Sequence, residues 1–139
     1  MGNRTFTIVK PDSVRKGNFV KIISRLESEG FKVLGLKKVA LSKGQAEGFY
    51  AVHRARPFFS GLVDYMTSGP VFLTCLERAD AVKKLRELVG ATDPAEAAPG
   101  TVRARFGKSK QMNSVHASDS AASADREVKL FFGVAALAR

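Results

Sequence analysis

The chain has 139 residues, 45% of them hydrophobic, which is enough to fold as one domain around a hydrophobic core. It carries 23 basic and 13 acidic residues, a formal net charge of +10, and this surplus favours an anionic partner. Nucleotides, nucleic acids and anionic membranes all meet that description, so the charge alone does not choose among them. We predict a single domain over residues 1–139.

Cysteine content and hydropathy favour a soluble cytoplasmic protein. The one cysteine, Cys75, cannot form an internal disulfide, so the cysteine count gives no sign of export. Residues 1–12 are too polar, and too soon interrupted by Pro11, for a signal peptide. No segment approaches the roughly 18 to 20 consecutive apolar residues of a membrane span, so we expect no membrane contact.

The first 41 residues predict a strand, a helix and a second strand. Residues 4–10 are rich in β-formers and end at Pro11, which cannot donate to a β-ladder. Apolar residues recur at helical spacing over 17–30, which predicts an amphipathic helix. Residues 31–41 then alternate as in a long strand, which we expect to bend at Gly35.

Two helices and a central strand are predicted next. Residues 42–53 favour a helix that begins after Ser42 as its N-cap. A short helix is expected over 60–66, followed by a turn at 68–70. The continuous apolar run over 71–77 is typical of a central strand.

The last third of the chain contains a long segment with little predicted structure. Residues 78–90 predict an amphipathic helix, but 91–112 are rich in Pro and Gly and predict a loop with one helical turn. Loops of this length in a compact domain are often functional. A short strand over 113–118 and a helix up to residue 132, capped by Ser118 or Ser120, complete the chain. We expect the apolar tail that follows to pack on a neighbouring molecule.

This order of elements predicts an α+β fold. Its core is βαββαβ, the ferredoxin-like arrangement, with additional helices. We expect a four-stranded antiparallel sheet with its helices on one face, which leaves the other face for assembly or ligand binding.

Several common motifs are absent, and the remaining chemistry is dispersed. The sequence has no GxxxxGK[ST], GxGxxG, CxxC, HExxH or GxSxG, so a protein-held metal is not expected. Cationic, hydroxyl and amide groups suited to phosphate oxygens are scattered along the chain. These are Lys10, Tyr50, Arg86, Thr92, Arg103, Asn113 and His116.

Four segments, in order, resemble the nucleoside diphosphate kinase family. They read RTFTIVKPDSVRKG, FYAVHRARPFFSGLVDYMTSGPV, GATDPAEAAPGTVRARF and NSVHASDS, and the last is similar to the family signature Asn-x-x-His-Gly-Ser-Asp. The resemblance runs from about Arg4 to Phe132. It implies a phosphotransferase that passes the γ-phosphoryl group of ATP or another nucleoside triphosphate to a nucleoside diphosphate.

The resemblance also implies roles for individual residues. His116 is expected to be the nucleophile of a ping-pong mechanism through a phosphohistidine, with Ser118 and Glu127 orienting its ring. Asn113 and Lys10 match positions that contact the ribose. The positions that hold phosphates are matched by Lys10, Tyr50, Arg86, Thr92 and Arg103.

Substrate and assembly are implied in the same way. Phe58 matches the aromatic residue that stacks on the base, and stacking with few base-edge hydrogen bonds predicts low base specificity. Mg²⁺ is expected to arrive with the nucleotide, bound mainly by its phosphates. The family forms homo-oligomers, tetramers or hexamers, between which the sequence does not choose.

Three residues depart from the family pattern. Ala117 replaces the usual Gly of the signature, which matters only if the backbone there needs a positive φ. Asp93 replaces the usual Asn beside Thr92, and we expect its charge to point towards Arg103 or Arg105. Lys110 falls where the second wall of the base slot is often apolar, although its methylene stem could cover a base.

Two polar residues are expected to lie outside the chemistry, and two other classes of function are consistent with the sequence. His53 is expected to be a surface or interface residue and Asp119 to cap the last helix. A basic ferredoxin-like domain can also bind single-stranded nucleic acid through aromatics on its open sheet face, although no RNP-like strand is present. A catalytically silent assembly subunit is the third possibility, and the intact His116 argues against it.

Overall fold

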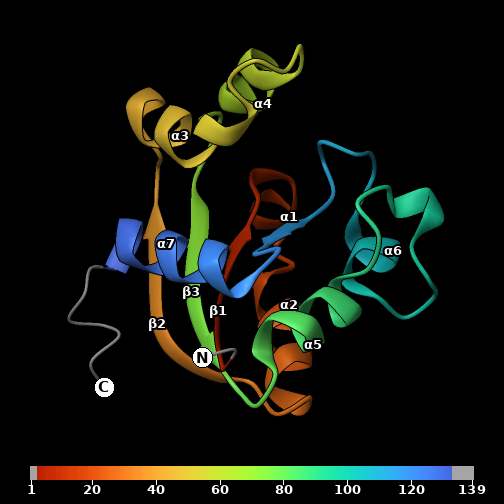
Figure 1. Cartoon of the computed structure of the whole chain (residues 1–139). Coiled ribbons are helices and arrows are strands. Elements are labelled where there is room, and N and C mark those ends of the chain that lie inside the picture. Colours follow the sequence, from red (N-terminus) through yellow and green to blue (C-terminus); the bar gives the residue numbers. More distant parts are fainter. Residues whose placement is uncertain (1–2, 133–139) are drawn as a thin grey trace.

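A computed structural model describes residues 3–132, within which four strands form one antiparallel sheet of order β2-β3-β1-β4 (Figure 1). The strands are β1 (Arg4–Val9), β2 (Lys32–Val39), β3 (Val71–Glu77) and β4 (Val115–Ala117). The helices are α1 (Pro11–Arg15), α2 (Phe19–Ser28), α3 (Lys43–Phe49), α4 (Phe59–Met66), α5 (Ala81–Val89), α6 (Val102–Phe106) and α7 (Ala121–Phe132), with 3-10 turns η1 (Ala51–His53) and η2 (Pro94–Glu96). The predicted ferredoxin-like arrangement is confirmed. The apolar tail expected to pack on a neighbour lies outside the described residues.

The expectation that the helices cover only one face of the sheet is wrong. Successive side chains of a strand point to opposite faces, and here both sets are buried. Phe6 and Ile8 of β1 pack with residues of α3, α4 and α7, whereas Val9 packs with residues of α2 and α5. Figure 1 shows α7 lying across one face of the sheet. Phe6 and Ile8 are completely buried, so this face does not offer aromatics to a single-stranded nucleic acid.

Helix α1 was not predicted. Pro11 fits the first position of a helix because its missing N–H would have no partner there and its φ is already helical. Asp12 in the first turn suits the helix dipole. These signals were present in the sequence, but a helix of five residues is too short to show apolar periodicity.

The bend predicted at Gly35 is confirmed as a β-bulge in the pairing of β2 with β3, between Val33 and Gly35. A Cβ atom on Gly35 would lie 2.9 Å from Cε1 of Phe132, at the end of α7. A side chain at this position would therefore require the Phe132 ring to move.

The predicted cap of α3 is confirmed, although the helix is shorter than expected. The Ser42 hydroxyl accepts from the Gln45 N–H at 3.1 Å, and the Gln45 side chain accepts from the Ser42 N–H at 2.9 Å. The helix ends at Phe49, and the chain continues through η1 towards α4.

The long segment after α5 contains more structure than one helical turn. It begins at Gly90, whose φ of +91° is one that favours glycine. A Cβ atom built on Gly90 would lie only 2.6 Å from Oγ1 of Thr101. The segment forms η2 and then α6, where the Thr101 hydroxyl accepts from the Ala104 N–H at 3.3 Å. This close packing of Gly90 on Thr101 places α6, and with it Arg103, beside the sheet.

Candidate active site

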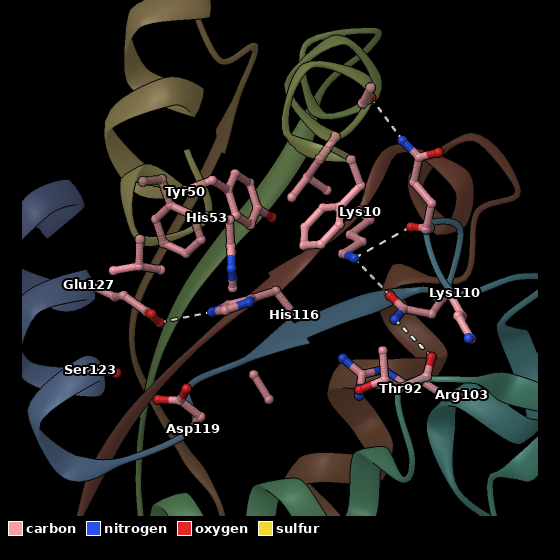
Figure 2. A pocket seen from close by; sticks show the side chains of 18 of the residues that line it. Lys10, Tyr50, His53, Thr92, Arg103, Lys110, His116, Asp119, Ser123 and Glu127 are labelled. Atoms are coloured by element: carbon pink, nitrogen blue, oxygen red, sulfur yellow. Dashed lines mark hydrogen bonds and ion pairs between the residues drawn. The ribbon is translucent and has the colours of Figure 1, made fainter. Parts of the chain in front are cut away.

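The dispersed residues singled out in the sequence meet in one cleft of about 1000 Å³. The cleft lies among the α3–α4 segment, the start of α7 and the loop between α6 and β4. Figure 2 shows Glu127 on one side of His116, and Lys10, Thr92 and Arg103 on the other. The predicted residues that line it are Lys10, Tyr50, Phe58, Arg86, Thr92, Arg103, Asn113, His116 and Glu127. Ser118 lies behind the wall and is completely buried.

His116 is held by a carboxylate on one side of its ring. It lies in the middle of β4, opposite Ile8 of β1, and its side chain is 20% exposed. Its Nε2 lies 2.9 Å from Oε1 of Glu127, a residue of α7. A carboxylate accepts this bond from a protonated Nε2, which leaves the lone pair of a neutral ring on Nδ1.

Aromatic side chains surround the His116 ring. The rings of Phe49 and Tyr50 lie edge-on to it, with centroids at 4.9 and 6.5 Å, and Phe6 lies at 6.2 Å. This burial lowers the pKa of His116 below its ordinary value of 6.5, although the bond to Glu127 acts in the opposite direction. The imidazole is therefore neutral, and nucleophilic, at neutral pH.

Ser118 and Ser120, just before α7, have different roles. The Ser118 hydroxyl donates to Oε1 of Glu127 at 2.8 Å, so the same oxygen accepts from both Ser118 and His116. Ser120 is the helix cap, because its hydroxyl accepts from the Ser123 N–H at 3.1 Å. Asp119, for which we expected this capping role, lines the cleft instead. Hydrogen bonds from the Ser123 and Ser120 hydroxyls, together with the charge of Arg86, lower its pKa.

Lys10 is a buried cation at the end of β1. Its Nζ donates to Oδ1 of Asn113 at 2.8 Å, and the Asn113 amide donates to the Thr92 carbonyl at 3.0 Å. Burial and the nearby Arg103 lower the pKa of Lys10 to about 8. A cation at this depth that has no direct carboxylate partner among residues 3–132 is suited to bind an anion.

Arg103 and Arg86 add two more cations. The Arg103 guanidinium donates to the carbonyls of Gly90 and Val115 at 3.1 and 2.9 Å, and its buried Nε has no hydrogen-bond partner among residues 3–132. Burial and the charge of Arg86 lower the pKa of Arg103 to about 10. Two guanidinium groups whose charges repel each other are stabilised by a bound polyanion.

Tyr50 contributes a hydroxyl that is not used inside the protein. The side chain is 6% exposed, and its Oη has no hydrogen-bond partner in the described part of the chain. Burial and the charge of Glu127 raise its pKa, so the group stays protonated and can donate. A buried hydroxyl in this state favours a bound ligand as its acceptor.

The other end of the cleft is aromatic and open. Phe58, at the N-cap of α4, is 52% exposed and lines the cleft. The ring of His53 lies 5.6 Å from that of Phe58. His53, expected at the surface or an interface, is only partly exposed and lines the cleft too.

The structure explains two of the three departures from the family pattern. Ala117 belongs to β4 and pairs with Thr7, so its backbone is extended and tolerates a methyl group. The Asp93 carboxylate accepts from the Ala95 N–H at 3.0 Å and caps η2, rather than pointing at an arginine. Lys110 is exposed and lines the cleft.

Gln111 was not singled out in the sequence. Its Nε2 donates to the Gly61 carbonyl of α4 at 2.8 Å, and its own carbonyl lies 3.4 Å from Nζ of Lys10. Gln111 thus joins two walls of the cleft. No sequence signal pointed to it, because an exposed glutamine in a loop has no periodicity and no motif of its own.

Replacing Gln111 with Ala should weaken binding of the nucleotides that the resemblance implies. Their KM should rise by about 2- to 10-fold with little change in kcat, since one hydrogen bond that fixes the cleft walls is lost. Initial-rate kinetics on both substrates measure this. Gln45→Ala is the matched control, because it removes the capping box of α3 outside the cleft and should lower stability without changing KM. An unchanged KM in Gln111→Ala would contradict the assigned contact.

Within residues 3–132, no group of three or more His, Cys, Asp or Glu side chains is arranged to hold a metal ion. None of the helices in this range is both long enough and apolar enough to cross a membrane.

Comparison with known proteins agrees with this geometry. The family model for nucleoside diphosphate kinase matches residues 3–137. The nucleoside diphosphate kinase of Nitratiruptor sp. is 54% identical over 129 residues, which cover 93% of this chain and 94% of the relative. That of Archaeoglobus fulgidus is also 54% identical, over 93% of this chain and 85% of the relative.

Solved structures give the same result. The Aquifex aeolicus nucleoside diphosphate kinase superposes with a TM-score of 0.94 at 46% identity, covering 96% of each chain. The Halobacterium salinarum enzyme, solved in complex with CDP, gives 0.92 at 44% identity, covering 95% of this chain and 88% of the other. Matches of this extent, over a chain whose cleft is lined by cations, identify a nucleotide phosphotransferase. The chain belongs to the nucleoside diphosphate kinase family.

Proposed function

We propose that residues 1–139 form one kinase domain that transfers the γ-phosphoryl group of a nucleoside triphosphate to a nucleoside diphosphate through Nδ1 of His116. The observation that carries this proposal is the bond between Nε2 of His116 and Glu127 at 2.9 Å, in a cleft lined by several cations. It leaves one ring nitrogen free to react. Low base specificity follows from a base site with one exposed aromatic residue, Phe58.

The first half-reaction forms a phosphohistidine. The Nδ1 lone pair attacks the γ-phosphorus, a nitrogen–phosphorus bond forms, and the bond to the β,γ-bridging oxygen breaks, releasing the nucleoside diphosphate. Positive charge that develops on the ring is stabilised by Glu127, which is itself held by Ser118. In the second half-reaction, a terminal oxygen of another nucleoside diphosphate attacks the same phosphorus and His116 is regenerated.

The cations and hydroxyls hold the phosphates while the charge moves. Lys10, Arg86 and Arg103 neutralise the phosphate oxygens, and the Tyr50 hydroxyl and Thr92 donate to them. Asn113 and Lys10 contact the ribose in this proposal, and the bond between their side chains at 2.8 Å supports a shared role. Mg²⁺ enters as part of the nucleotide substrate, bound mainly by its phosphates, and neutralises charge on them.

Bisubstrate kinetics test the function. With MgATP and GDP as substrates, a covalent intermediate predicts parallel lines in double-reciprocal plots of initial rate. Intersecting lines would mean that both nucleotides bind before transfer, and would contradict the proposed intermediate. Salt-sensitive binding of oligonucleotides without any phosphate exchange would favour the nucleic-acid alternative instead.

The pH dependence of kcat/KM for MgATP should be bell-shaped, because it reports groups of the free enzyme. His116 must be neutral, and its lowered pKa keeps it neutral at 6.5, so activity is lost only as the pH falls below that value. Lys10 must be charged, so activity is lost as the pH rises through about 8. Rate profiles over this range measure both limbs. An acid limb above 6.5 would contradict the assignment of His116.

Assembly and location stay proposals. Homo-oligomerisation, to a tetramer or a hexamer, is supported by exposed apolar side chains on the outer strand β2 and on α2, Leu36 and Val20, which are 47% and 68% exposed. Sedimentation equilibrium distinguishes four chains from six, and a monomer would contradict the proposal. A cytoplasmic location is supported by the sole cysteine, Cys75, which is a buried free thiol.

A further inference from the structure

Asp12, the third residue of the Lys-Pro-Asp segment, has no part in the mechanism above. It is 4% exposed, at the start of α1. Its Oδ2 accepts from the Ser114 N–H at 3.0 Å, and its Oδ1 accepts from the Tyr65 hydroxyl at 2.5 Å. Tyr65 in turn accepts from the Asp12 N–H at 2.8 Å. The carboxylate therefore joins α1, the end of α4 and the start of β4.

Ser114 has an unusual backbone. Its φ is +75°, a conformation that side chains other than glycine rarely adopt, and it is completely buried. Each of its polar groups is held by the segment after β1. Its N–H donates to Asp12, its carbonyl accepts from the Lys10 N–H at 2.8 Å, and its hydroxyl lies 2.6 Å from that of Ser13. Such a backbone persists where its surroundings fix it.

The conformation of Ser114 determines where two site residues lie. Asn113 precedes it and bonds Nζ of Lys10 through its side chain. His116 follows two residues later in β4. If Ser114 moved to an ordinary φ, Asn113 and His116 could not both keep their present positions relative to Lys10.

We propose that Asp12 is a positioning residue for phosphoryl transfer, which fixes the strained backbone of Ser114 and thereby aligns Asn113 and His116 with Lys10. This inference rests on the proposed function, because it concerns the alignment of the proposed nucleophile. It gives the Asp of Lys-Pro-Asp a role separate from that of the lysine.

The charge of Asp12 has a second effect, on Lys10. The charged groups that act on Lys10 are Arg103 of α6, which lowers its pKa, and Asp12 of α1, which raises it. Asp12 also acts electrostatically on Tyr65 of α4 and Lys16 after α1, and Lys10 interacts with His116 of β4. Removal of the Asp12 charge should therefore lower the pKa of Lys10 further, an effect that loss of packing alone would not produce.

Asp12→Asn is the test, because it keeps the shape and removes the charge. We expect kcat/KM to fall about 10- to 100-fold, mainly through kcat, since the nucleophile is misaligned. We also expect the alkaline limb to move to lower pH by roughly half to one unit. A ¹³C NMR titration of Lys10 in nucleotide-free protein reports the same shift without depending on activity. Asp64→Asn is the control, since Asp64 is exposed on α4 and should leave both readouts unchanged.

Each outcome is informative. If kcat and the Lys10 titration of Asp12→Asn match the wild type, the inference is wrong, whereas failure of the wild type to exchange phosphate would refute the proposed function. Should Asp12→Asn not fold, the double variant Asp12→Asn/Ser114→Gly applies, because glycine adopts this φ without strain. The double variant should fold and still show the lowered pKa of Lys10. If Lys10 of the double variant titrated as in the wild type, the inference would also be overturned.

Discussion

His116→Asn should lower the rate of phosphoryl transfer by roughly 10⁵- to 10⁶-fold, the size of effect expected when a covalent nucleophile is removed. Asparagine is too short to reach Glu127, but Ser118 still donates to that carboxylate, so the packing of α7 on β4 should be retained. Asparagine has no nucleophilic nitrogen, because the amide lone pair is delocalised. Steady-state assays with MgATP and GDP, on protein with an unchanged thermal unfolding temperature, measure the loss.

The other histidine provides the comparison. His53 lines the same cleft, but its ring lies beside that of Phe58 rather than on β4, and His53→Asn should still accept phosphate from MgATP. A change in KM is the effect expected there, since the ring lies next to Phe58. If His53→Asn lost transfer and His116→Asn kept it, the nucleophile would be wrongly assigned.

Lys10→Met should lower kcat/KM by about 10²- to 10³-fold, as the loss of one preorganised charge in a buried site does. Methionine retains the apolar stem but removes the ammonium that Asn113 now accepts from. The residual activity should also lack the alkaline limb near pH 8, because the group that titrates there is gone. The measurement is kcat/KM for MgATP between pH 6 and pH 10.

Lys83→Met is the matched control, because Lys83 is exposed on α5 and does not line the cleft. It should behave as the wild type. A Lys10→Met variant that retained both its rate and the alkaline limb would show that another group binds the phosphates and titrates.

Local patterns in the sequence predicted most of the fold, and tertiary contacts determined the remainder. Alternating side chains predicted β1, Ser42 predicted the start of α3, and Gly35 predicted the bend of β2. All three features depend mainly on residues that are neighbours in the sequence. That helices cover both faces of the sheet could not be predicted, because the amphipathic pattern of α7 is the same whichever face it packs on. Helix α1 was missed, because five residues are too few for a periodic pattern.

The site divides in the same way. The resemblance predicted His116, Glu127 and Lys10 as site residues, and the structure places them in one cleft. The sequence could not indicate which ring nitrogen of His116 is free, because that depends on how α7 lies against β4. Asp12 and Gln111 act through contacts 102 and 50 residues away in the chain, and no local signal encodes such contacts.

The most direct test of the central claim is to isolate the intermediate. Wild-type protein incubated with MgATP alone should gain one phosphoryl group, stable in base and labile in acid, and tandem mass spectrometry should locate it on His116. Addition of GDP should discharge it at a rate at least equal to kcat. Phosphate on another residue, equal labelling of His116→Asn, or a label that GDP does not discharge would contradict the account.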